Sequence, residues 1–310
     1  MTPTLLKAHL ALFLVNALYG ASHVIAKGVM PDFVTPNVFI LFRVVGATAL
    51  FWILKWLFVK ERVERKDLIR LAACGLFGVA INQLFFFNGL NLTSAINSGI
   101  IMTLNPIFVV GLSFFLLKES ITIKKSIGIM FGAGGAILLT LTAGTGVGDS
   151  LRGDLFLFIN AVSYAVYLVL VKPLMKKYKP ITVITYVFSF GLIYILLYPP
   201  TLSEFASTDF SLMTNSVIAK IVYVVIGVTF FTYLLTAYSL KTLSPTVSSV
   251  YIYLQPILVI IFAYTLAAVG FADDYTETIT SEKLLYMLII FIGVYITSST
   301  SFSSKGKINR

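Results

Sequence analysis

The sequence has 310 residues, of which 58% are apolar and only 12% are charged, and its mean hydropathy is +0.94. A soluble domain is about half apolar and about one quarter charged, so this composition excludes an ordinary soluble protein and predicts one that spans a lipid bilayer. The lone Cys74 excludes an internal disulfide and a cysteine metal or redox pair. The net charge is +10, and its meaning depends on where the basic residues fall along the chain.

Ten stretches are long and apolar enough to cross roughly 30 Å of hydrocarbon as helices of about 20 residues. In chain order these predicted spans are residues 8–27, 36–58, 69–90, 95–117, 126–143, 153–171, 181–198, 216–239, 246–268 and 284–300. The first span has no small-residue cleavage site after a short apolar core, so we expect it to be retained and not removed as a signal peptide. The predicted fold is an all-α polytopic membrane protein with ten transmembrane helices.

Basic residues are concentrated in alternate loops between the predicted spans. The run KERVERKDLIR (60–70) is one such loop, whereas Glu204, Asp273 and Asp274 fall in loops on the other side. Because Lys and Arg resist translocation, the basic loops are predicted to be cytoplasmic, which puts both termini in the cytoplasm. The positive net charge is then a signal of topology, and nucleic acid is not expected as a partner because its binding needs a basic face on a folded domain.

The two halves of the chain resemble each other. Residues 82–106 align without a gap with 232–256, and 19–30 align with 164–175. The repeat is five predicted spans long, and because five is odd the second copy enters the bilayer from the opposite side, giving two inverted five-helix repeats. The predicted units are residues 1–143 for the first repeat, 144–152 for an outer linker, 153–300 for the second repeat and 301–310 for a cytoplasmic tail.

Each repeat has an amide side chain directly before a proline inside an apolar span: Asn105 before Pro106, and Gln255 before Pro256. Proline has no N–H and clashes with the carbonyl four residues earlier, so we expect the carbonyls of Met102 and Ile252 to lose their helical partners. Unpaired carbonyls are costly in lipid, which predicts that both sites face protein or a wet cavity. Inverted repeats commonly enclose such a cavity near the midplane and alternate its access between the two sides.

Polar side chains at helical spacing extend this prediction to other spans. The candidate substrate-binding residues are Asn16, Tyr19, His23, Arg43, Asn82, Ser98, Asn105, Tyr164, Tyr167, Ser248, Tyr251 and Gln255. Interhelical hydrogen bonding is the alternative role for any one of them. Arg43 either reaches toward the membrane surface or faces a substrate carboxylate, and His23 either relays a proton or packs.

Other patterns narrow the function. Small residues four apart in GIMFGAGG (128–135) predict close helix contact. No Asp or Glu lies in the interior of a predicted span, since Asp154 and Glu119 lie at span ends, and this favours facilitated diffusion or exchange over tightly ion-coupled pumping. There is no phosphate-binding loop, and two histidines with one cysteine make a catalytic triad or zinc site unexpected, so we expect no cofactor, no metal and no enzymatic activity.

The motifs LYGASHVIAK in the first span, ILFR in the second and LNPIFVVGLSFFLLKESITIKKSIGIMFGAGGAILL (104–139) resemble the drug/metabolite transporter superfamily, EamA type. The resemblance covers residues 8–300. It implies a secondary transporter of a small polar metabolite in the bacterial inner membrane, often an exporter of amino acids or their derivatives. The expected partners are a small-molecule substrate and the lipid bilayer, and both a monomer and a homodimer stay open.

Two alternatives remain. The same fold also suits a nucleotide-sugar carrier or a flippase for lipid-linked substrates, although a nucleotide sugar would call for more cavity cations than Arg43 alone. A membrane-embedded enzyme would need a cluster of acidic residues or histidines at an interface, and the sequence has none.

Overall fold

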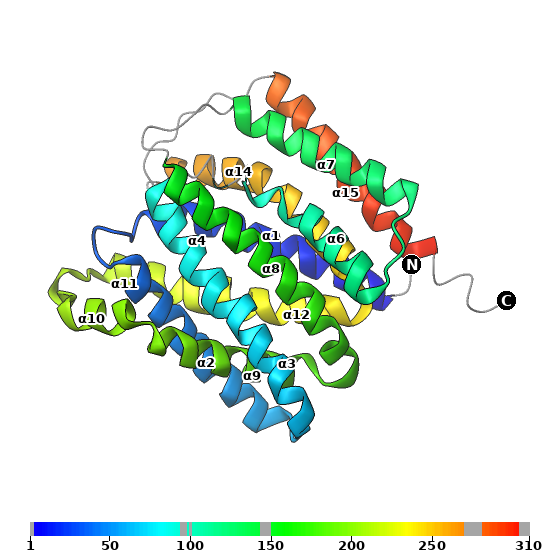
Figure 1. Cartoon of the computed structure of the whole chain (residues 1–310). Helices are drawn as coiled ribbons and strands as arrows, with labels where there is room; N and C mark the ends of the chain where they lie inside the picture. Colours follow the sequence, from blue (N-terminus) through cyan, green and yellow to red (C-terminus); the bar gives the residue numbers. More distant parts are fainter. Residues whose placement is uncertain (1–2, 94–97, 99–100, 143–149, 270–280, 304–310) are drawn as a thin grey trace.

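The structure is a computed structural model that describes residues 3–93, 98, 101–142, 150–269 and 281–303, apart from a few side chains within these ranges. Over these ranges the chain forms helices and turns and no β-strand. Figure 1 shows the helices gathered into one bundle, with the first helix running through its middle. The expected linker and tail fall largely outside the described residues, at 143–149 and 304–310.

The described helices follow the order of the predicted spans. The N-terminal half contains α1 (Pro3–Lys27), α2 (Pro36–Phe58), α3 (Arg65–Gly75), the π-helical segment η1 (Leu76–Ala80), α4 (Ile81–Leu92), α6 (Asn105–Leu117) and α7 (Ile123–Thr142). The C-terminal half contains α8 (Leu151–Lys177), α9 (Pro180–Leu197), α10 (Pro199–Ser207), η2 (Phe210–Leu212), α11 (Asn215–Tyr223), the π-helical segment η3 (Val224–Phe231), α12 (Thr232–Thr242), α13 (Pro245–Val250), the 3₁₀ segment η4 (Tyr251–Leu254), α14 (Gln255–Ala268) and α15 (Ser281–Ser303).

Capping residues fix where many of these helices begin. Thr35 precedes α2 and its Oγ1 accepts from the Val38 N–H, while Pro36 occupies the first turn, where its missing N–H costs nothing. Ser150 and Thr214 cap α8 and α11 in the same way. The helix starts are therefore set by local sequence, and the apolar content of each span then decides what it packs against.

Within the described residues, seven helical segments are long and apolar enough to cross a membrane, judged by length and composition alone. They are Pro3–Ser22, Pro36–Phe58, Arg65–Leu92, Leu151–Lys177, Pro180–Leu197, Asn215–Thr242 and Pro245–Leu266. The shorter apolar helices Asn105–Leu117 and Leu284–Thr297 fall within two more of the expected spans. Large apolar side chains cover the outside of the bundle, such as Trp56 (79% exposed) and Phe115 (77%), as expected for a protein surrounded by lipid. The protein is thus a multi-pass helical membrane protein.

Each proline lies at the start of a new helix and not inside a continuous span, which corrects the expectation of unbroken helices at both sites. Pro106 and Pro256 are the second residues of α6 and α14; residues 103–104 form a turn before α6, and Tyr251–Leu254 form the 3₁₀ segment η4 before α14. At η4 the Gln255 N–H donates to the Ile252 carbonyl, so that carbonyl is not left without a partner. A proline in a first turn loses no hydrogen bond, which is why the chain starts a new helix there.

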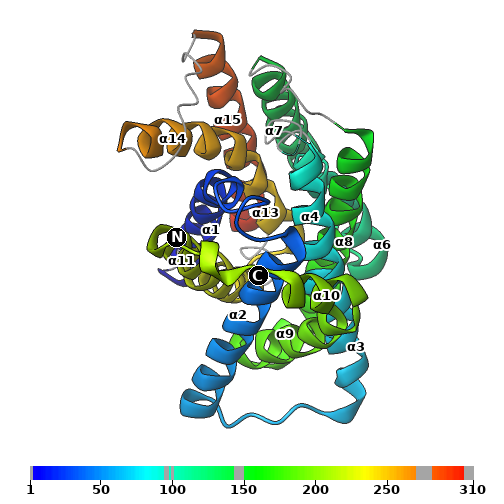
Figure 2. The ribbon, with the colours of Figure 1, turned by 90° about the vertical axis from the view of Figure 1, so that its left-hand side faces the viewer.

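The helix contacts between the two halves of the chain occur in corresponding pairs. Helix α4 packs along α8 and α1 packs along α12; α6 packs on α8 and α14 packs on α1. The α2–α9 and α7–α15 pairs each join one helix from each half, and both views show these pairs side by side (Figures 1 and 2). The π-helical segments also correspond, because η1 lies between α3 and α4 and η3 lies between α11 and α12.

The glycine-rich segment forms a close helix contact, as expected from its spacing. A Cβ built on Gly293 of α15 would lie 2.3 Å from the Gly132 backbone nitrogen, and one on Gly128 of α7 would lie 2.1 Å from Thr297 Oγ1. Side chains larger than hydrogen would push α7 and α15 apart, so the glycines allow the two helices to touch along their backbones.

Polar contacts tie helix ends together where α2 finishes and α3 begins. Lys177 Nζ lies 2.6 Å from Asp67 Oδ2 and 2.7 Å from Glu64 Oε1, which joins α8 to the start of α3. Hydrogen bonds from Lys177 and Lys66, together with their positive charge, lower the pKa of the exposed Glu64 carboxyl. Exposed pairs of this kind add little stability, so their effect is mainly to set where the helix ends meet.

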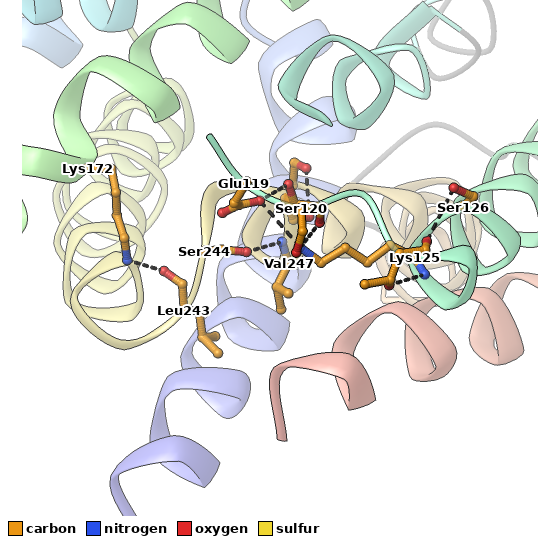
Figure 3. A network of polar contacts seen from close by, with 11 residues as sticks. Glu119, Ser120, Lys125, Ser126, Lys172, Leu243, Ser244 and Val247 are labelled. Atoms are coloured by element: carbon orange, nitrogen blue, oxygen red, sulfur yellow. Dashed lines mark hydrogen bonds and ion pairs between the residues drawn. The ribbon is translucent and has the colours of Figure 1, made fainter. Parts of the chain in front are cut away.

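A second set of end contacts surrounds the start of α13 (Figure 3). Thr246 Oγ1 donates to Glu119 Oε2 at 2.5 Å, and Lys125 Nζ lies 3.6 Å from the same oxygen, so one carboxylate joins the chain after α6 to both α7 and α13. Nearby, Lys172 Nζ of α8 donates to the carbonyls of Leu240 and Leu243 at the end of α12. These contacts link elements of the two halves at one end of the bundle.

Candidate functional site

A cavity lies inside the bundle, with an empty volume of about 870 Å³ that includes the space where it opens. Its walls come from both halves of the chain, whereas α7, α9 and α15 contribute none of the described lining. The lining residues are Leu12, Val15, Asn16, Tyr19, Ser22, Arg43, Asn82, Gln83, Phe86, Phe87, Met102, Asn105, Asn160, Tyr164, Leu168, Val228, Tyr233, Thr236, Ser248, Ile252 and Gln255.

The structure brings most of the sequence-predicted site residues together at this cavity. Those that line it are Asn16, Tyr19, Arg43, Asn82, Asn105, Tyr164, Ser248 and Gln255. They come from α1, α2, α4, α6, α8, α13 and α14, which meet only in the folded bundle. The repeat and the helical spacing therefore identified side chains that line the same cavity. That these side chains bind a substrate stays a prediction.

The remaining candidates are not part of the described lining. The side chain of His23 is outside the described residues, and Ser98 is buried but is not part of the lining. Tyr167 is fully buried behind the cavity wall, where its ring lies 5.9 Å from that of Tyr164 and packs onto Gly78 of η1. These three residues are not placed in contact with the cavity.

Tyr251 also lies outside the lining, and the local backbone explains why. The α-helical spacing that selects Tyr251 would put it on the same face as Gln255, four residues later, but the intervening segment is 3₁₀ and not α-helical. Successive residues turn by about 120° in a 3₁₀ helix, so two residues four apart no longer point the same way. The Tyr251 hydroxyl instead forms a 2.7 Å hydrogen bond with His9 Nδ1.

Asn105 presents an acceptor to the cavity. Its Nδ2 donates to the Ala161 carbonyl at 2.8 Å, and a carbonyl can only accept, so the amide orientation is fixed. The Oδ1 atom is buried without a hydrogen-bond partner. This bond joins α6 to α8 directly at the break before Pro106, so the break positions the amide.

Gln255 is held in the corresponding way on α1. Asn16 Nδ2 donates to the Leu12 carbonyl at 2.8 Å, which leaves Asn16 Oδ1 to accept from Gln255 Nε2 at 3.0 Å. The remaining acceptor of Gln255 is then its own Oε1. The two proline-adjacent amides thus each donate to the neighbouring helix and keep an oxygen for other partners.

The structure adds a pair that the candidate set did not contain. Gln83 Nε2 donates to Tyr233 Oη at 3.3 Å, and Tyr233 Oη donates to the Gly78 carbonyl at 2.8 Å. Gln83 Oε1 is buried without a partner. The alignment of residues 82–106 with 232–256 pairs position 83 with position 233, so the repeat itself was the signal that could have identified them.

Arg43 is the one residue with a formal charge in the described lining. It is only 3% exposed, its Nε donates to Thr229 Oγ1 at 2.9 Å, and its guanidinium carbon lies 4.3 Å from the centre of the Phe87 ring. Its Nη1 is buried without a hydrogen-bond partner. Because the Arg43 side chain is buried among helices, its position does not support the alternative that it reaches toward the membrane surface.

Several polar atoms at the cavity therefore lack hydrogen-bond partners within the described structure, among them Arg43 Nη1, Gln83 Oε1, Asn105 Oδ1 and Ser248 Oγ. Buried polar atoms are normally paired with protein or water, and leaving one unpaired costs about 1 to 3 kcal/mol. Their concentration at one cavity indicates that it holds water or a polar ligand. Among the described residues, no group of three or more His, Cys, Asp or Glu could hold a metal ion.

The fold and this site define a multi-pass membrane protein with a polar cavity between its two halves. The family model of the EamA-like transporter family matches residues 6–141 and 151–299, so the chain belongs to that family. Membership implies a small-molecule substrate and a protein embedded in the membrane.

Relatives of known sequence agree with this assignment. Two Archaeoglobus fulgidus proteins, each described as an uncharacterized transporter, are 26% identical over 264 residues (85% of this chain, 89% of theirs) and 25% identical over 299 residues (94% and 98%). The uncharacterized transporter YyaM of Bacillus subtilis is 26% identical over 245 residues (77% and 76%). One crystal structure shares the fold, with a TM-score of 0.71 at 18% identity over 96% of this chain and 98% of the other.

Proposed function

We propose that this protein is a secondary transporter that carries a small polar metabolite, such as an amino acid or a derivative, across the bacterial inner membrane, mainly as an exporter. The observation that carries the proposal is the set of unpartnered polar atoms on the wall of one cavity between the two halves. A polar substrate that replaced water there would supply the missing hydrogen bonds, and the apolar remainder of the wall would exclude further solvent.

Alternating access between two inverted five-helix repeats is the proposed mechanism. It is supported by the matched helix contacts, by a π-helical segment in each half and by the new helix start at Asn105 and at Gln255. In this arrangement ten spans cross the bilayer, both termini are cytoplasmic, and the cavity opens to one side at a time. Labelling of cysteines introduced at 144–152 tests the topology, because reaction from the cytoplasmic side would rule out the inverted arrangement.

The described lining holds no Asp or Glu that could bind a proton or sodium ion for coupling. Uniport or exchange is therefore the proposed mode of transport. Flux measured in proteoliposomes with and without a pH gradient tests this, because a strong dependence of flux on the gradient would require a coupled mechanism.

The two proline-adjacent amides give the functional test. We expect the double variant Asn105→Ala, Gln255→Ala to lose substrate uptake in proteoliposomes screened with a metabolite panel, while its chromatographic profile and membrane insertion stay normal. Asn215→Ala is the matched control, since Asn215 is an exposed residue at the start of α11, and it should transport like the native protein. Normal uptake by the double variant would assign both amides to helix packing alone.

A further inference from the structure

We infer that the cavity contains an anion-binding subsite at Arg43 and that the substrate carries an anionic group, a carboxylate or a group of similar size and charge. The inference rests on the proposed transport function and names the chemical class of its substrate. It depends on how Arg43 is buried, what holds it and what is missing around it.

Arg43 is fixed in place by its neighbours. Thr229 Oγ1 accepts from Arg43 Nε at 2.9 Å and itself donates to the Val224 carbonyl at 2.9 Å, so the π-helical segment η3 anchors one edge of the guanidinium. Phe87 of α4 covers one face, 4.3 Å away. An arginine held along its Nε edge and its face has its Nη end left for a partner.

That partner is absent from the described part of the chain. No described Asp or Glu forms an ion pair with Arg43, no acid is among the described lining residues, and Nη1 has no hydrogen-bond partner. A buried cation is costly unless it is paired, and the face of Phe87 offsets only part of the cost. A carboxylate offers the two oxygens that match a guanidinium, so an anionic substrate group would complete the site.

The other polar atoms direct the anionic group to Arg43. Asn105 Oδ1 and Gln83 Oε1 are acceptors, which repel an anion and suit the donor groups of a substrate. The cavity wall thus offers one cation, at Arg43, and uncharged acceptors at the two amide oxygens. A ligand with an anionic end is oriented by this difference, whereas a cationic ligand has no carboxylate to meet among the described lining residues.

The charge of the cavity can be measured without knowing the substrate. Ser248 lines the cavity and is replaced by cysteine as a reporter, with little change in volume. The native Cys74 is fully buried, and the unsubstituted protein measures any background reaction at it. The reporter variant in proteoliposomes is treated either with the anionic reagent sulfonatoethyl methanethiosulfonate or with the cationic trimethylammonioethyl reagent. The rate at which each reagent modifies the cysteine is divided by the rate at which the same reagent modifies a free thiol in solution.

We expect the normalised ratio of anionic to cationic rates to exceed one. It should fall by about tenfold in Arg43→Gln, because one unit charge acts across a confined cavity of low effective dielectric. Arg43→Lys should keep most of the ratio, since it keeps the charge and loses only the fork geometry. Arg152→Gln is the control, because Arg152 is exposed at the start of α8 and also lies over an aromatic ring, that of Phe156.

The possible results distinguish a failure of the anion-subsite proposal from a failure of the transporter proposal. A ratio that stays within about twofold in Arg43→Gln, while the reporter reacts from the two sides of the membrane in turn, overturns the anion subsite and leaves the transporter proposal standing. A ratio that falls equally in Arg43→Lys assigns Arg43 a structural role and also overturns the subsite. A reporter that neither reagent reaches from either side contradicts both proposals, because the cavity would then not be open to solutes.

Discussion

Replacing Tyr233 by phenylalanine removes one hydroxyl from the cavity wall and leaves the aromatic ring in place. The Tyr233 ring is almost fully buried and packs edge-to-face on Phe188, with ring centres 4.7 Å apart, so the substitution should not change packing. It removes the bonds that the hydroxyl donates to the Gly78 carbonyl at 2.8 Å and to Asn82 Oδ1 at 3.3 Å, and the bond that it accepts from Gln83 Nε2 at 3.3 Å. The lost energy then belongs to hydrogen bonding alone.

The expected cost is about 1 to 2 kcal/mol. A buried hydrogen bond contributes about 1 kcal/mol net, and a buried group left without a partner adds to that, but bonds between helices in membranes average only about 0.6 kcal/mol. Tyr253 provides a matched control, since it is also fully buried and its hydroxyl has no hydrogen-bond partner among the described residues. Tyr253→Phe should change stability by less than about 0.5 kcal/mol or should stabilise, because no bond is lost.

The assay is reversible unfolding of each purified variant in mixed micelles of dodecyl maltoside and increasing dodecyl sulfate, followed by circular dichroism. The free energies of unfolding of the two tyrosine variants should differ by at least about 0.5 kcal/mol. A double-mutant cycle of Tyr233→Phe with Gln83→Leu should also give a non-additive term. Equal destabilisation by Tyr233→Phe and Tyr253→Phe would refute the assignment of the bonds at Gly78.

Two further outcomes are expected. Gly293→Ala should destabilise the protein by about 1 to 3 kcal/mol in the same unfolding assay, because its Cβ would meet the Gly132 backbone, whereas Gly134→Ala should not, having no atom within 4 Å of the added carbon. Hydrogen bonds from Lys177 lower the pKa of Glu64, so the native protein should be more stable than Glu64→Gln above about pH 4.5. The difference in stability should vanish as the pH falls below the lowered pKa and the carboxylate is protonated. A difference that persists in acid would contradict the ion pair.

Much of the architecture could be predicted from the sequence because lipid restricts what a chain can do. Apolar stretches of span length indicate helices, and the described helices begin and end close to those stretches. The repeat was also informative, since Asn105 and Gln255 were expected to be related and both open a new helix beside the cavity.

What the sequence could not provide was the local departure from α-helical geometry. The choice of Ser248, Tyr251 and Gln255 by helical spacing assumed an unbroken α-helix, and the 3₁₀ segment η4 instead places the Tyr251 hydroxyl on His9. Similarly, nothing in the residues of η1 and η3 indicates a π-helix, so the hydroxyl of Thr229 could not be placed on Arg43. Periodicity predicts faces only where the helical pitch is regular.

The contact between Gln83 and Tyr233 makes each half of the chain depend on the other. These positions correspond in the two aligned halves, yet their side chains meet each other, one supplying an amide and the other a phenol. A chain with two identical halves would bring the same side chain to this junction twice. Replacing either half by a copy of the other would therefore place two amides or two phenols here and would remove the amide–phenol hydrogen bond.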